Sequence, residues 1–412
     1  MQYGCIGEHL THSFSREIHE QIADYLYALK EIPMGELDSF MTERAFKAIN
    51  VTIPYKQDVI PHLSYIDPIA SKIGAVNTIV NRNGELFGYN TDFGGMESMI
   101  QNLGISLMNK KVLIFGTGGT SKTAAAVSEH LGASAIYKVS RSPRSGVLTY
   151  EDVLSFHTDA EILINTTPKG MYSREKGMPV DPKLFKKLEG VVDAVYNPLR
   201  TEFVRTALEM GVPAVGGLYM LVCQAVLASE IFLDTKYPAE LTEDIYHKIL
   251  GSKENIVLTG MPGSGKSTVG KLLAEKMQRP YYDTDTLITE KTGKTPAELI
   301  VSLGESAFRI IESEVVKEIS EINSAIIATG GGIVLRHENV DSLRMNGKLF
   351  FLDRPLEQLL PTCDRPLSST KEALEKRYHE RYDIYNGTAD FVIQNDTSPL
   401  AAVEAIERNF YQ

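Results

Sequence analysis

Two glycine-rich loops constrain the fold of this chain more than any other feature of its sequence. The first loop spans residues 116–120 and follows the apolar run 112–115; the second spans residues 260–268 and follows the apolar run 256–258. A strand, a glycine turn and a helix, in that order, place free backbone amides where they can bind a phosphate group. Because the glycine spacing differs between the loops, we expect two different phosphate-binding sites, each on an α/β fold with a parallel sheet.

Length and composition indicate a chain of more than one domain. A chain of 412 residues is too long for one hydrophobic core of ordinary size. The formal net charge of −11 disfavours nucleic acid, which binds basic surfaces. We find no apolar stretch that would span a membrane and no signal peptide, so we expect no membrane partner. The three cysteines lie far apart, which argues against disulfides or a zinc site and for a cytoplasmic enzyme. The sequence does not indicate the oligomeric state.

The first loop has part of the dinucleotide-binding pattern G-x-G-x-x-G. Gly116 and Gly118 match, Gly119 adjoins them, and the third glycine of the pattern is absent. A strand precedes the loop and the helical run 123–131 follows it, so the helix N-terminus would face a pyrophosphate. The alternative is an ordinary tight turn.

The next expected strand, 135–139, ends in a basic and hydroxylated segment. Ser140 and Arg141 stand where an acidic residue would bind the ribose 2′-hydroxyl of NAD. A guanidinium with neighbouring hydroxyls suits the 2′-phosphate of NADP instead. The alternative is a solvated surface arginine.

The second loop satisfies the P-loop pattern G-x-x-x-x-G-K-[ST] in full. In such a loop the backbone amides cradle the phosphates of ATP, the lysine reaches the β- and γ-phosphates, and the final hydroxyl binds Mg²⁺. The ATP-binding residues that we predict are Gly260, Gly263, Ser264, Gly265, Lys266, Ser267 and Thr268.

Seven further motifs precede the second loop, in residues 7–19, 50–56, 74–78, 88–92, 165–171, 196–198 and 216–224. In their residues and their order they resemble shikimate dehydrogenase, and the resemblance covers residues 1 to about 240. It implies that Lys56 and Asp92 form the catalytic pair, with the lysine handing a proton to the developing alkoxide. The alternative for Lys56 alone is an exposed surface charge.

The same resemblance implies how the substrate and the cofactor are held. A small polyhydroxylated acid needs neutral hydrogen-bond partners, although a serine here could also cap a helix and Asn77 could instead be a turn residue. The resemblance also adds Gly217 to the predicted cofactor site, which already contains the glycines of the first loop together with Ser140 and Arg141. The substrate-binding residues that we predict are Ser13, Ser15, Thr52, Asn77, Tyr196 and Gln224.

The motifs around the second loop, in residues 282–285, 304–312, 329–332, 364–367 and 381–390, resemble shikimate kinase over residues 254–412. The resemblance implies that Asp283 supports the metal with Ser267, and that Asp285 accepts the proton of the acceptor hydroxyl. The remaining implied roles are a carboxylate clamp of Arg309 and Arg381, close approach of the backbone at Gly330, Gly331 and Gly332, and phosphoryl stabilisation by the lid residue Arg365. Individually, Arg309 could be a surface ion-pair partner, Asp283 a helix cap and the glycines a plain loop.

Departures from both families leave alternatives open. The lid segment 355–365 has fewer arginines than the kinase family usually carries, Asp383 stands where proline is common, and Ser140 replaces an asparagine. Rival interpretations are a dehydrogenase that uses quinate with NAD, a P-loop domain acting on another hydroxy acid, and one half that only binds or regulates.

We therefore predict a bifunctional shikimate-pathway enzyme that reduces 3-dehydroshikimate with NADPH and phosphorylates the resulting shikimate with MgATP. Long helices are expected over 15–30 and 219–234. The expected domains are a substrate lobe at 1–95 completed by 218–240, a Rossmann-like NADP lobe at 96–217, a linker at 241–253 and a P-loop kinase domain at 254–412.

Overall fold

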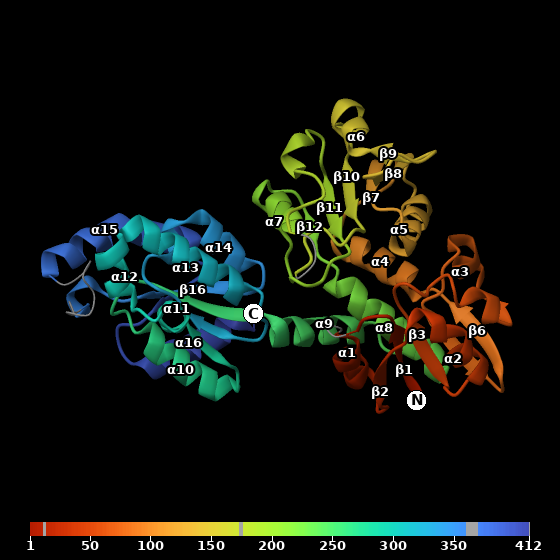
Figure 1. Cartoon of the computed structure of the whole chain (residues 1–412), viewed down its shortest axis with the longest axis horizontal. Helices are drawn as coiled ribbons and strands as arrows, with labels where there is room; N and C mark the ends of the chain where they lie inside the picture. Colours follow the sequence, from red (N-terminus) through yellow and green to blue (C-terminus); the bar gives the residue numbers. More distant parts are fainter. Residues whose placement is uncertain (11–13, 173–175, 360–369, 412) are drawn as a thin grey trace. The chain divides into compact units, whose positions relative to one another are not determined.

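The computed structural model describes residues 1–10, 14–172, 176–359 and 370–411. The chain divides into two compact units, Met1–Ile249 and Leu250–Gln412 (Figure 1). Within these described ranges, the N-terminal unit contains two six-stranded sheets and the C-terminal unit contains one five-stranded sheet. Helices cover these sheets, which confirms the predicted α/β class. In the described part of the chain, no helix combines the length and the apolar character that a membrane span requires.

The first sheet of the N-terminal unit is mixed, unlike the parallel sheets expected at the two glycine loops. Its strand order is β2-β1-β3-β5-β6-β4; β1, β2 and β3 are parallel, whereas β5 runs antiparallel to β3 and β6. The elements are β1 (Tyr3–Gly7), α1 (Ser15–Ile22), β2 (Tyr27–Glu31), α2 (Leu37–Glu43), β3 (Ala48–Val51), β4 (Tyr65–Ile66), α3 (Pro68–Ile73), β5 (Thr78–Arg82) and β6 (Glu85–Tyr89).

The antiparallel pair is a hairpin whose turn consists of two residues. Asn83 and Gly84 have φ values of 55° and 91°. Asparagine followed by glycine is the sequence that best tolerates two consecutive left-handed residues, and this backbone twist matches that of the flanking strands. The turn sets the register that pairs Thr78 with Tyr89.

The helix predicted over 15–30 is wrong beyond Ile22. The N-cap position is occupied by Phe14, so Ser15 is the first helical residue and does not cap the helix. The chain then forms β2, which pairs in parallel with β1. Strand pairing and burial prevail over local helix preference at this point, because Tyr27 is only 2% exposed once β2 is in the sheet.

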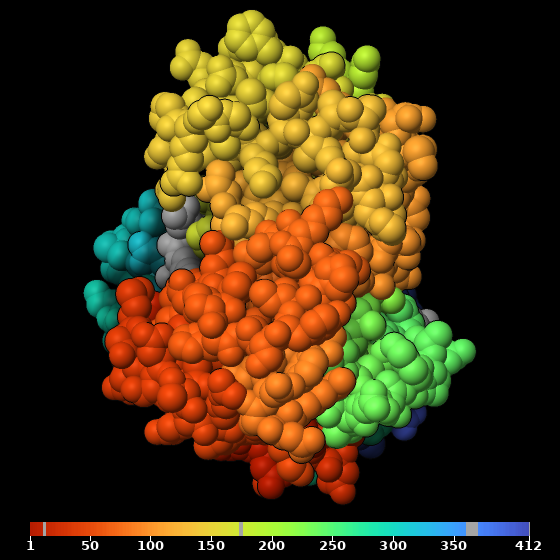
Figure 2. Space-filling model, turned by 90° about the vertical axis from the view of Figure 1, so that its right-hand side faces the viewer, coloured from red at the N-terminus to blue at the C-terminus, as the bar shows by residue number. Residues whose placement is uncertain are grey.

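The second sheet is parallel throughout and has the strand order β12-β11-β10-β7-β8-β9. This is the doubly wound order of dinucleotide-binding sheets, in which ligands bind outside the carboxyl ends of the central strands, here β7 and β10. The lobe of this sheet is the yellow mass in Figure 2, beside the red and orange lobe of the first sheet. The elements are β7 (Lys111–Phe115), α5 (Gly119–His130), β8 (Ala135–Ser140), β9 (Leu148–Thr149), α6 (Tyr150–Phe156), β10 (Ile162–Asn165), β11 (Gly190–Asp193), α7 (Glu202–Glu209) and β12 (Ala214–Val215).

Two helices, α4 (Thr91–Asn102) and α8 (Leu218–Leu233), join the two lobes. The position of α8 confirms the helix predicted over 219–234. At one end α8 contributes Met220 to the core of the second sheet, and at the other end it contributes Phe232 to the core beside the first sheet. One rigid helix thus belongs to both cores and fixes the two lobes against each other.

The sheet of the C-terminal unit is parallel and has the strand order β14-β15-β13-β16-β17. Residues 241–253, the predicted linker, are helical in the structure, within α9 (Glu240–Lys253). The other elements are β13 (Asn255–Thr259), α10 (Lys266–Met277), β14 (Tyr281–Asp283), α11 (Thr284–Thr292), α12 (Pro296–Leu303), α13 (Glu305–Ser320), β15 (Ile326–Ala328), α14 (His337–Arg344), β16 (Gly347–Asp353), α15 (Lys371–Thr388), β17 (Phe391–Gln394) and α16 (Pro399–Phe410).

A fully buried histidine couples the stability of the N-terminal unit to pH. His19 of α1 is 0% exposed, and its ring stacks on Tyr27 of β2 with the centroids 3.8 Å apart. Its Nδ1 lies 2.6 Å from the hydroxyl of Tyr25. Burial lowers the pKa of His19 from 6.5 to about 3, because the charged ring would lose its hydration.

We predict that His19→Phe flattens the pH dependence of stability. The unfolded chain takes up this proton near pH 6.5 and the folded chain only near pH 3, so the folded state loses stability as the pH falls between these values. From pH 7 to pH 5 the loss from this group is about 2 kcal/mol. Urea unfolding followed by circular dichroism at both pH values measures it. His130→Gln, whose side chain is 61% exposed, is the control and should behave like the wild type.

Candidate active sites

A cavity of about 160 Å³ lies in the N-terminal unit and is lined by residues of both lobes. Polar groups from separate motifs meet on its wall, although they are distant in the sequence. The predicted residues that line it are Ser15, Thr52, Lys56, Asn77, Asp92, Tyr196, Gly217 and Gln224. Ser13 lies outside the described residues.

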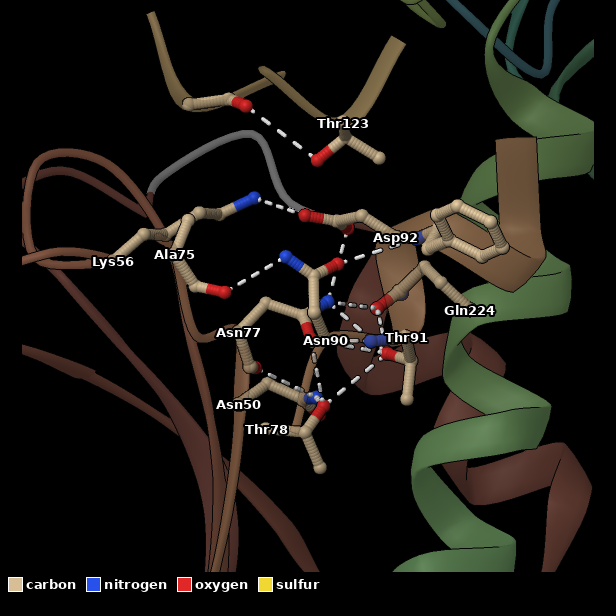
Figure 3. Close-up of polar contacts among 12 residues, drawn as sticks. Asn50, Lys56, Ala75, Asn77, Thr78, Asn90, Thr91, Asp92, Thr123 and Gln224 are labelled. Atoms are coloured by element: carbon tan, nitrogen blue, oxygen red, sulfur yellow. Dashed lines mark hydrogen bonds and ion pairs between the residues drawn. The ribbon is translucent and has the colours of Figure 1, made fainter. Parts of the chain in front are cut away.

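Lys56 and Asp92 form a close ion pair in this cavity (Figure 3). The Nζ of Lys56 donates to Oδ2 of Asp92 at 2.6 Å, and the two side chains are 15% and 10% exposed. Lys56 is therefore not an exposed surface charge. Asp92 lies in the first turn of α4, where the free backbone amides favour a negative charge. The helix N-terminus and the lysine together hold the carboxylate in place.

Asn77 connects the ion pair to the rest of the polar wall and is more than a turn residue. Its Nδ2 donates to Oδ1 of Asp92 at 2.9 Å and to Oγ1 of Thr91 at 3.0 Å, and it lies 3.4 Å from Oε1 of Gln224. Its Oδ1 accepts from the backbone N–H of Thr91 at 2.7 Å. Figure 3 shows these side chains pointing toward one another: Asn77 lies directly before β5, Thr91 and Asp92 begin α4, and Gln224 lies on α8. With Asn77 only 2% exposed, this network fixes every group in one orientation.

Gln224 reaches the network because α4 and α8 approach closely. A Cβ on Gly95 would lie 2.8 Å from the carbonyl oxygen of Met220, and a Cβ on Gly94 would lie 2.6 Å from the side chain of Leu227. Two glycines on the contact face therefore set the distance between the helices. The packing of the lobes and the geometry of the cavity depend on the same contact.

The polar residues on the cavity wall that the sequence analysis missed include Tyr27 and Asn50. The hydroxyl of Tyr27 donates to Oδ1 of Asn50 at 2.6 Å, and Nδ2 of Asn50 donates to Oγ1 of Thr78 at 3.1 Å. Asn50 opens the motif that contains Thr52 and Lys56, which was a usable signal. Tyr27 gave none, because its segment was assigned to a helix.

The first glycine loop turns sharply between β7 and α5. Gly116 has a φ of 116°, and a Cβ there would lie 2.5 Å from Oγ1 of Thr166. Only glycine combines this backbone conformation with such close contact. A Cβ on Gly119, the first residue of α5, would lie 3.8 Å from Cδ of Lys56, so the helix N-terminus opens toward the ion pair. This geometry suits a dinucleotide whose phosphates bind the α5 amides.

Basic residues follow β8 at the edge of this loop. Ser140 is the last residue of β8, and its Oγ accepts from the backbone N–H of Ser142 at 3.2 Å. Arg141 is exposed. The sequence analysis missed Arg144, whose Nη1 donates to Oγ1 of Thr117 in the glycine loop at 3.3 Å. Two arginines thus follow the strand whose end, in dinucleotide-binding folds, lies beside the 2′ position of the ribose.

The second glycine loop has the shape of a phosphate cradle. Gly260 and Gly265 have φ values of 142° and 94°, and a Cβ on either would lie 2.8 Å from a neighbouring atom. Nζ of Lys266 donates to the carbonyl oxygens of Gly260 and Met261 at 2.8 and 2.9 Å. The buried hydroxyl of Ser264 has no hydrogen-bond partner within the described ranges. A spare donor, a held lysine and this backbone suit the phosphates of ATP.

Ser267 and Asp283 meet beside the loop. The hydroxyl of Ser267 donates to Oδ2 of Asp283 at 2.9 Å, while Oδ1 of Asp283 caps α11 by accepting from the backbone N–H of Asp285 at 3.0 Å. Asp283 is therefore a helix cap and also has an oxygen directed at Ser267. The described residues contain no cluster of three or more metal-binding side chains. Two oxygen groups still suit Mg²⁺, which usually keeps several waters and binds phosphate.

A cavity of about 510 Å³ joins the P-loop to the other groups predicted in the C-terminal unit. One open space therefore reaches from the nucleotide end to the expected substrate end. The predicted residues that line it are Lys266, Ser267, Asp283, Asp285, Arg309, Gly330, Gly331, Gly332 and Arg381. Arg365 and most of the predicted lid lie outside the described residues.

Arg309 lies flat against the glycine segment inside this cavity and is not a surface residue, since its side chain is 11% exposed. A Cβ on Gly332 would lie 2.1 Å from Nη1 of Arg309, and a Cβ on Gly330 would lie 2.8 Å from Oδ1 of Asp285. Nη1 of Arg309 donates to both oxygens of Glu312 at 2.9 and 2.8 Å. Burial raises the pKa of Glu312, and the neighbouring Arg309 opposes that rise.

Arg381 approaches the same glycine segment from α15. Its Nη1 donates to the carbonyl oxygen of Gly331 at 2.7 Å, and the hydroxyl of Tyr385 donates to the same oxygen. Burial raises the pKa of Tyr385 to about 12, so this hydroxyl stays a donor. Both contacts fix the direction in which Arg381 points, even though Asp383 replaces the common proline.

The known proteins that this chain resembles fall into two groups, one matching its N-terminal part and the other its C-terminal part. The family model for the shikimate dehydrogenase substrate binding domain matches residues 5–79, and that for shikimate kinase matches residues 262–409. The chain is 35% identical to the NADP(+) shikimate dehydrogenase of Clostridium beijerinckii, covering 59% of this chain and 96% of that protein. It is 42% identical to the shikimate kinase of Clostridium botulinum, covering 38% of this chain and 96% of that protein.

A solved structure agrees with these matches. The shikimate dehydrogenase of Thermus thermophilus in complex with NADP(H) and shikimate is 28% identical, with a TM-score of 0.55, covering 60% of this chain and 99% of that chain. Each relative is therefore matched over nearly its whole length, by a different part of this chain. The chain belongs to the NADP-dependent shikimate dehydrogenases by its N-terminal part and to the ATP-dependent shikimate kinases by its C-terminal part, and is a fusion of these two shikimate-pathway enzymes.

Proposed function

We propose that the N-terminal unit reduces 3-dehydroshikimate to shikimate with NADPH, and that the C-terminal unit phosphorylates this shikimate to shikimate 3-phosphate with MgATP. The observation that carries the proposal is that each unit gathers its predicted polar groups on the wall of a single cavity beside a glycine loop. Both substrates are small molecules. We also place the reactions in the cytoplasm, because the three cysteines lie far apart, as is usual in a reduced chain.

In the dehydrogenase, NADPH supplies the hydride, and the protein must supply a proton to the developing alkoxide. Lys56 is the proposed proton donor, because its ammonium borders the cavity and Asp92 holds it at 2.6 Å. Asp92 also orients a substrate hydroxyl. Ser15, Thr52, Asn77, Tyr196 and Gln224 are the proposed hydrogen-bond partners of the remaining polar groups of the substrate, with Ser13 as a further candidate.

In the kinase, positioning and charge stabilisation supply most of the catalysis. Asp285 is the proposed acceptor of the hydroxyl proton, and Lys266 is the proposed partner of the transferring phosphate. Ser267 and Asp283 are proposed to hold Mg²⁺, which neutralises the phosphate charge when bound. Arg309 and Arg381 are proposed to bind the carboxylate of shikimate, while Gly330, Gly331 and Gly332 let the ring approach the backbone and Arg365 assists from the lid.

The domain assignment remains part of the proposal. We assign residues 1–95 with 218–240 to the substrate lobe, 96–217 to the NADP lobe and 254–412 to the kinase. The sheets support this division, because the first sheet lies within 1–95 and the second within 96–217. Helix α8 completes the substrate lobe with Gln224.

We predict that a substitution in one proposed site lowers the activity of that site and leaves the other activity unchanged. Lys56→Ala should lower the turnover of the reductase by roughly 10²- to 10⁴-fold, the usual contribution of a proton-transfer group, and leave the kinase unchanged. Lys266→Ala should abolish kinase turnover and leave the reductase unchanged. Steady-state assays of both activities on each purified variant measure this. Loss of both activities from either substitution would contradict independent sites.

The coupled reaction tests the substrates themselves. Purified protein with 3-dehydroshikimate, NADPH and MgATP should accumulate shikimate 3-phosphate, identified by mass spectrometry. Accumulation of shikimate alone would contradict the kinase assignment. If neither product forms while quinate is oxidised with NAD, the dehydrogenase assignment is wrong.

We predict that Arg144→Ala raises the KM for NADPH and leaves the KM for NADH within about twofold. Each guanidinium–phosphate contact contributes roughly 1.5–3 kcal/mol, which corresponds to roughly 10- to 100-fold in KM. Arg141→Ala should act in the same direction. The control is Arg82→Ala, because Arg82 lies on β5 over the ring of Phe87 and far from the glycine loop in the sequence. Equal losses with both cofactors would exclude a 2′-phosphate site.

We predict that Gly332→Ala raises the KM for shikimate by roughly 10- to 100-fold, through the loss of a charged hydrogen bond. The φ of Gly332 is −111°, which alanine adopts freely, but the new Cβ would displace the guanidinium of Arg309. Since a flexible side chain can move, the free energy of unfolding should change little. The control is Gly387→Ala, where, beyond the chain neighbours and the helix's own backbone, no atom of the described residues lies within 4 Å of the added Cβ. An unchanged KM would show that the position of Arg309 does not matter for shikimate binding.

A further inference from the structure

The proposed carboxylate clamp of the kinase has little net positive charge of its own. Nη1 of Arg309 donates to Glu312, and Nη2 donates to Oε1 of Glu305 at 2.9 Å. Hydrogen bonds from Arg309 hold the pKa of Glu305 below its usual value, so this carboxylate is ionised. The charges of Arg309 and Arg381 are therefore matched by those of Glu305 and Glu312. A carboxylate entering this part of the cavity needs a further cation.

Arg377 lies where this further cation is needed. It lies on α15 four residues before Arg381, so both side chains leave the same face of the helix. Both residues line the 510 Å³ cavity, together with Arg309. Burial and the neighbouring charge of Arg381 lower the pKa of Arg377, and Glu305 partly opposes this. An arginine remains charged despite such a shift.

Two like charges one helical turn apart destabilise a helix when nothing lies between them. An anion bound between Arg377 and Arg381 removes this repulsion and gains two charge-assisted hydrogen bonds. The arrangement is therefore more favourable with an anion than without one. The cavity is also lined by Asp285 and by residues of the P-loop, so a ring held by its carboxylate lies in the same space as the proposed proton acceptor and the nucleotide site.

We propose that Arg377 is a third substrate-binding arginine of the kinase, which binds the carboxylate of shikimate together with Arg309 and Arg381. This inference rests on the proposed kinase function of the cavity. It assigns a role to a residue that the sequence analysis left without one.

The first experiment compares Arg377→Ala with the wild type in steady-state kinase assays. The KM for shikimate should rise roughly 10- to 100-fold, as expected for a lost charge-assisted contact. The kcat and the KM for ATP should stay within about twofold, because the phosphoryl-transfer groups are untouched. Arg377→Lys should recover part of the loss, since lysine keeps the charge but not the planar fork. Because Arg377 lies in the C-terminal unit, the unchanged kcat and KM for ATP report that the kinase of each variant is intact.

The matched control is Lys376→Ala, which removes the same charge from the adjacent position of α15. Its side chain is 77% exposed and lies 3.9 Å from Glu380. Its KM for shikimate should remain that of the wild type. If the KM for shikimate rises as much as in Arg377→Ala, the loss of any positive charge on α15 has this effect, and the inference is overturned.

An analogue of shikimate without the carboxylate charge distinguishes a role of Arg377 in binding the carboxylate from a role in supporting the fold. For the methyl ester of shikimate, Arg377→Ala and the wild type should have equal kcat/KM, or equal inhibition constants if the ester is not phosphorylated. An equal loss with the acid and the ester would mean that Arg377 only supports the fold, which overturns the inference.

Arg381→Ala, measured in the same series, separates this inference from the proposed function. If Arg381→Ala raises the KM for shikimate and Arg377→Ala does not, the inference fails and the proposed carboxylate clamp stands. If neither substitution changes the KM, the proposed shikimate site is itself wrong.

Discussion

The backbone amides in the first turn of a helix have no partner within that helix, and both units use this property directly after a parallel strand. The first glycine loop places the N-terminus of α5 at the carboxyl end of β7, and the second places that of α10 at the end of β13. Parallel strands end at one edge of a sheet, so residues from distant motifs meet there. Asp92 and Asp285 follow the same rule, because each lies in the first turn of a helix at such an edge.

The dehydrogenase cavity adds a second constraint, which is the close packing of α4 on α8. Gly94 and Gly95 let the helices approach until Gln224 lies beside Asn77. The contact that holds the two lobes together thus also sets the spacing of the polar groups on the cavity wall. A side chain added on this face would shift Asp92 as well as Gln224, since both are fixed by the same pair of helices. Stability of the unit and geometry of the cavity cannot change independently at this contact.

Much of the fold could be predicted from the sequence, because glycine loops after apolar runs are local signals with a single physical cause. The P-loop, the parallel NADP-type sheet and α8 lie where the pattern indicates them. The hairpin at Asn83 and Gly84 carried a local signal that was not used. β2 carried none, because Tyr27 becomes buried only through pairing with β1 and stacking on His19. Such tertiary effects override helix propensity and leave no periodic trace.

The residues of the candidate sites also include some that local sequence signals predict and others that they do not. Residues in compact motifs, such as Lys56 and Ser267, could be found from their neighbours in the sequence. Arg144 and Arg377 could not, because nothing local distinguishes them from surface arginines; only the fold brings them to Thr117 and to the kinase cavity.

On the proposed assignment, the two cavities recognise the same small acid in different ways, and their different cosubstrates explain the difference. The dehydrogenase wall consists largely of neutral hydroxyl and amide groups around one lysine–aspartate pair. Such a wall holds a polyhydroxylated ring without binding its charge strongly, which suits a product that must leave. The kinase must bring a carboxylate into the same space as the phosphates of ATP, and like charges repel strongly in a partly dry cavity. In the proposed kinase site, Arg309, Arg377 and Arg381 line the cavity and would offset this repulsion at the carboxylate. Lys266, with Mg²⁺ when it is bound, would offset the repulsion at the phosphates in the same cavity.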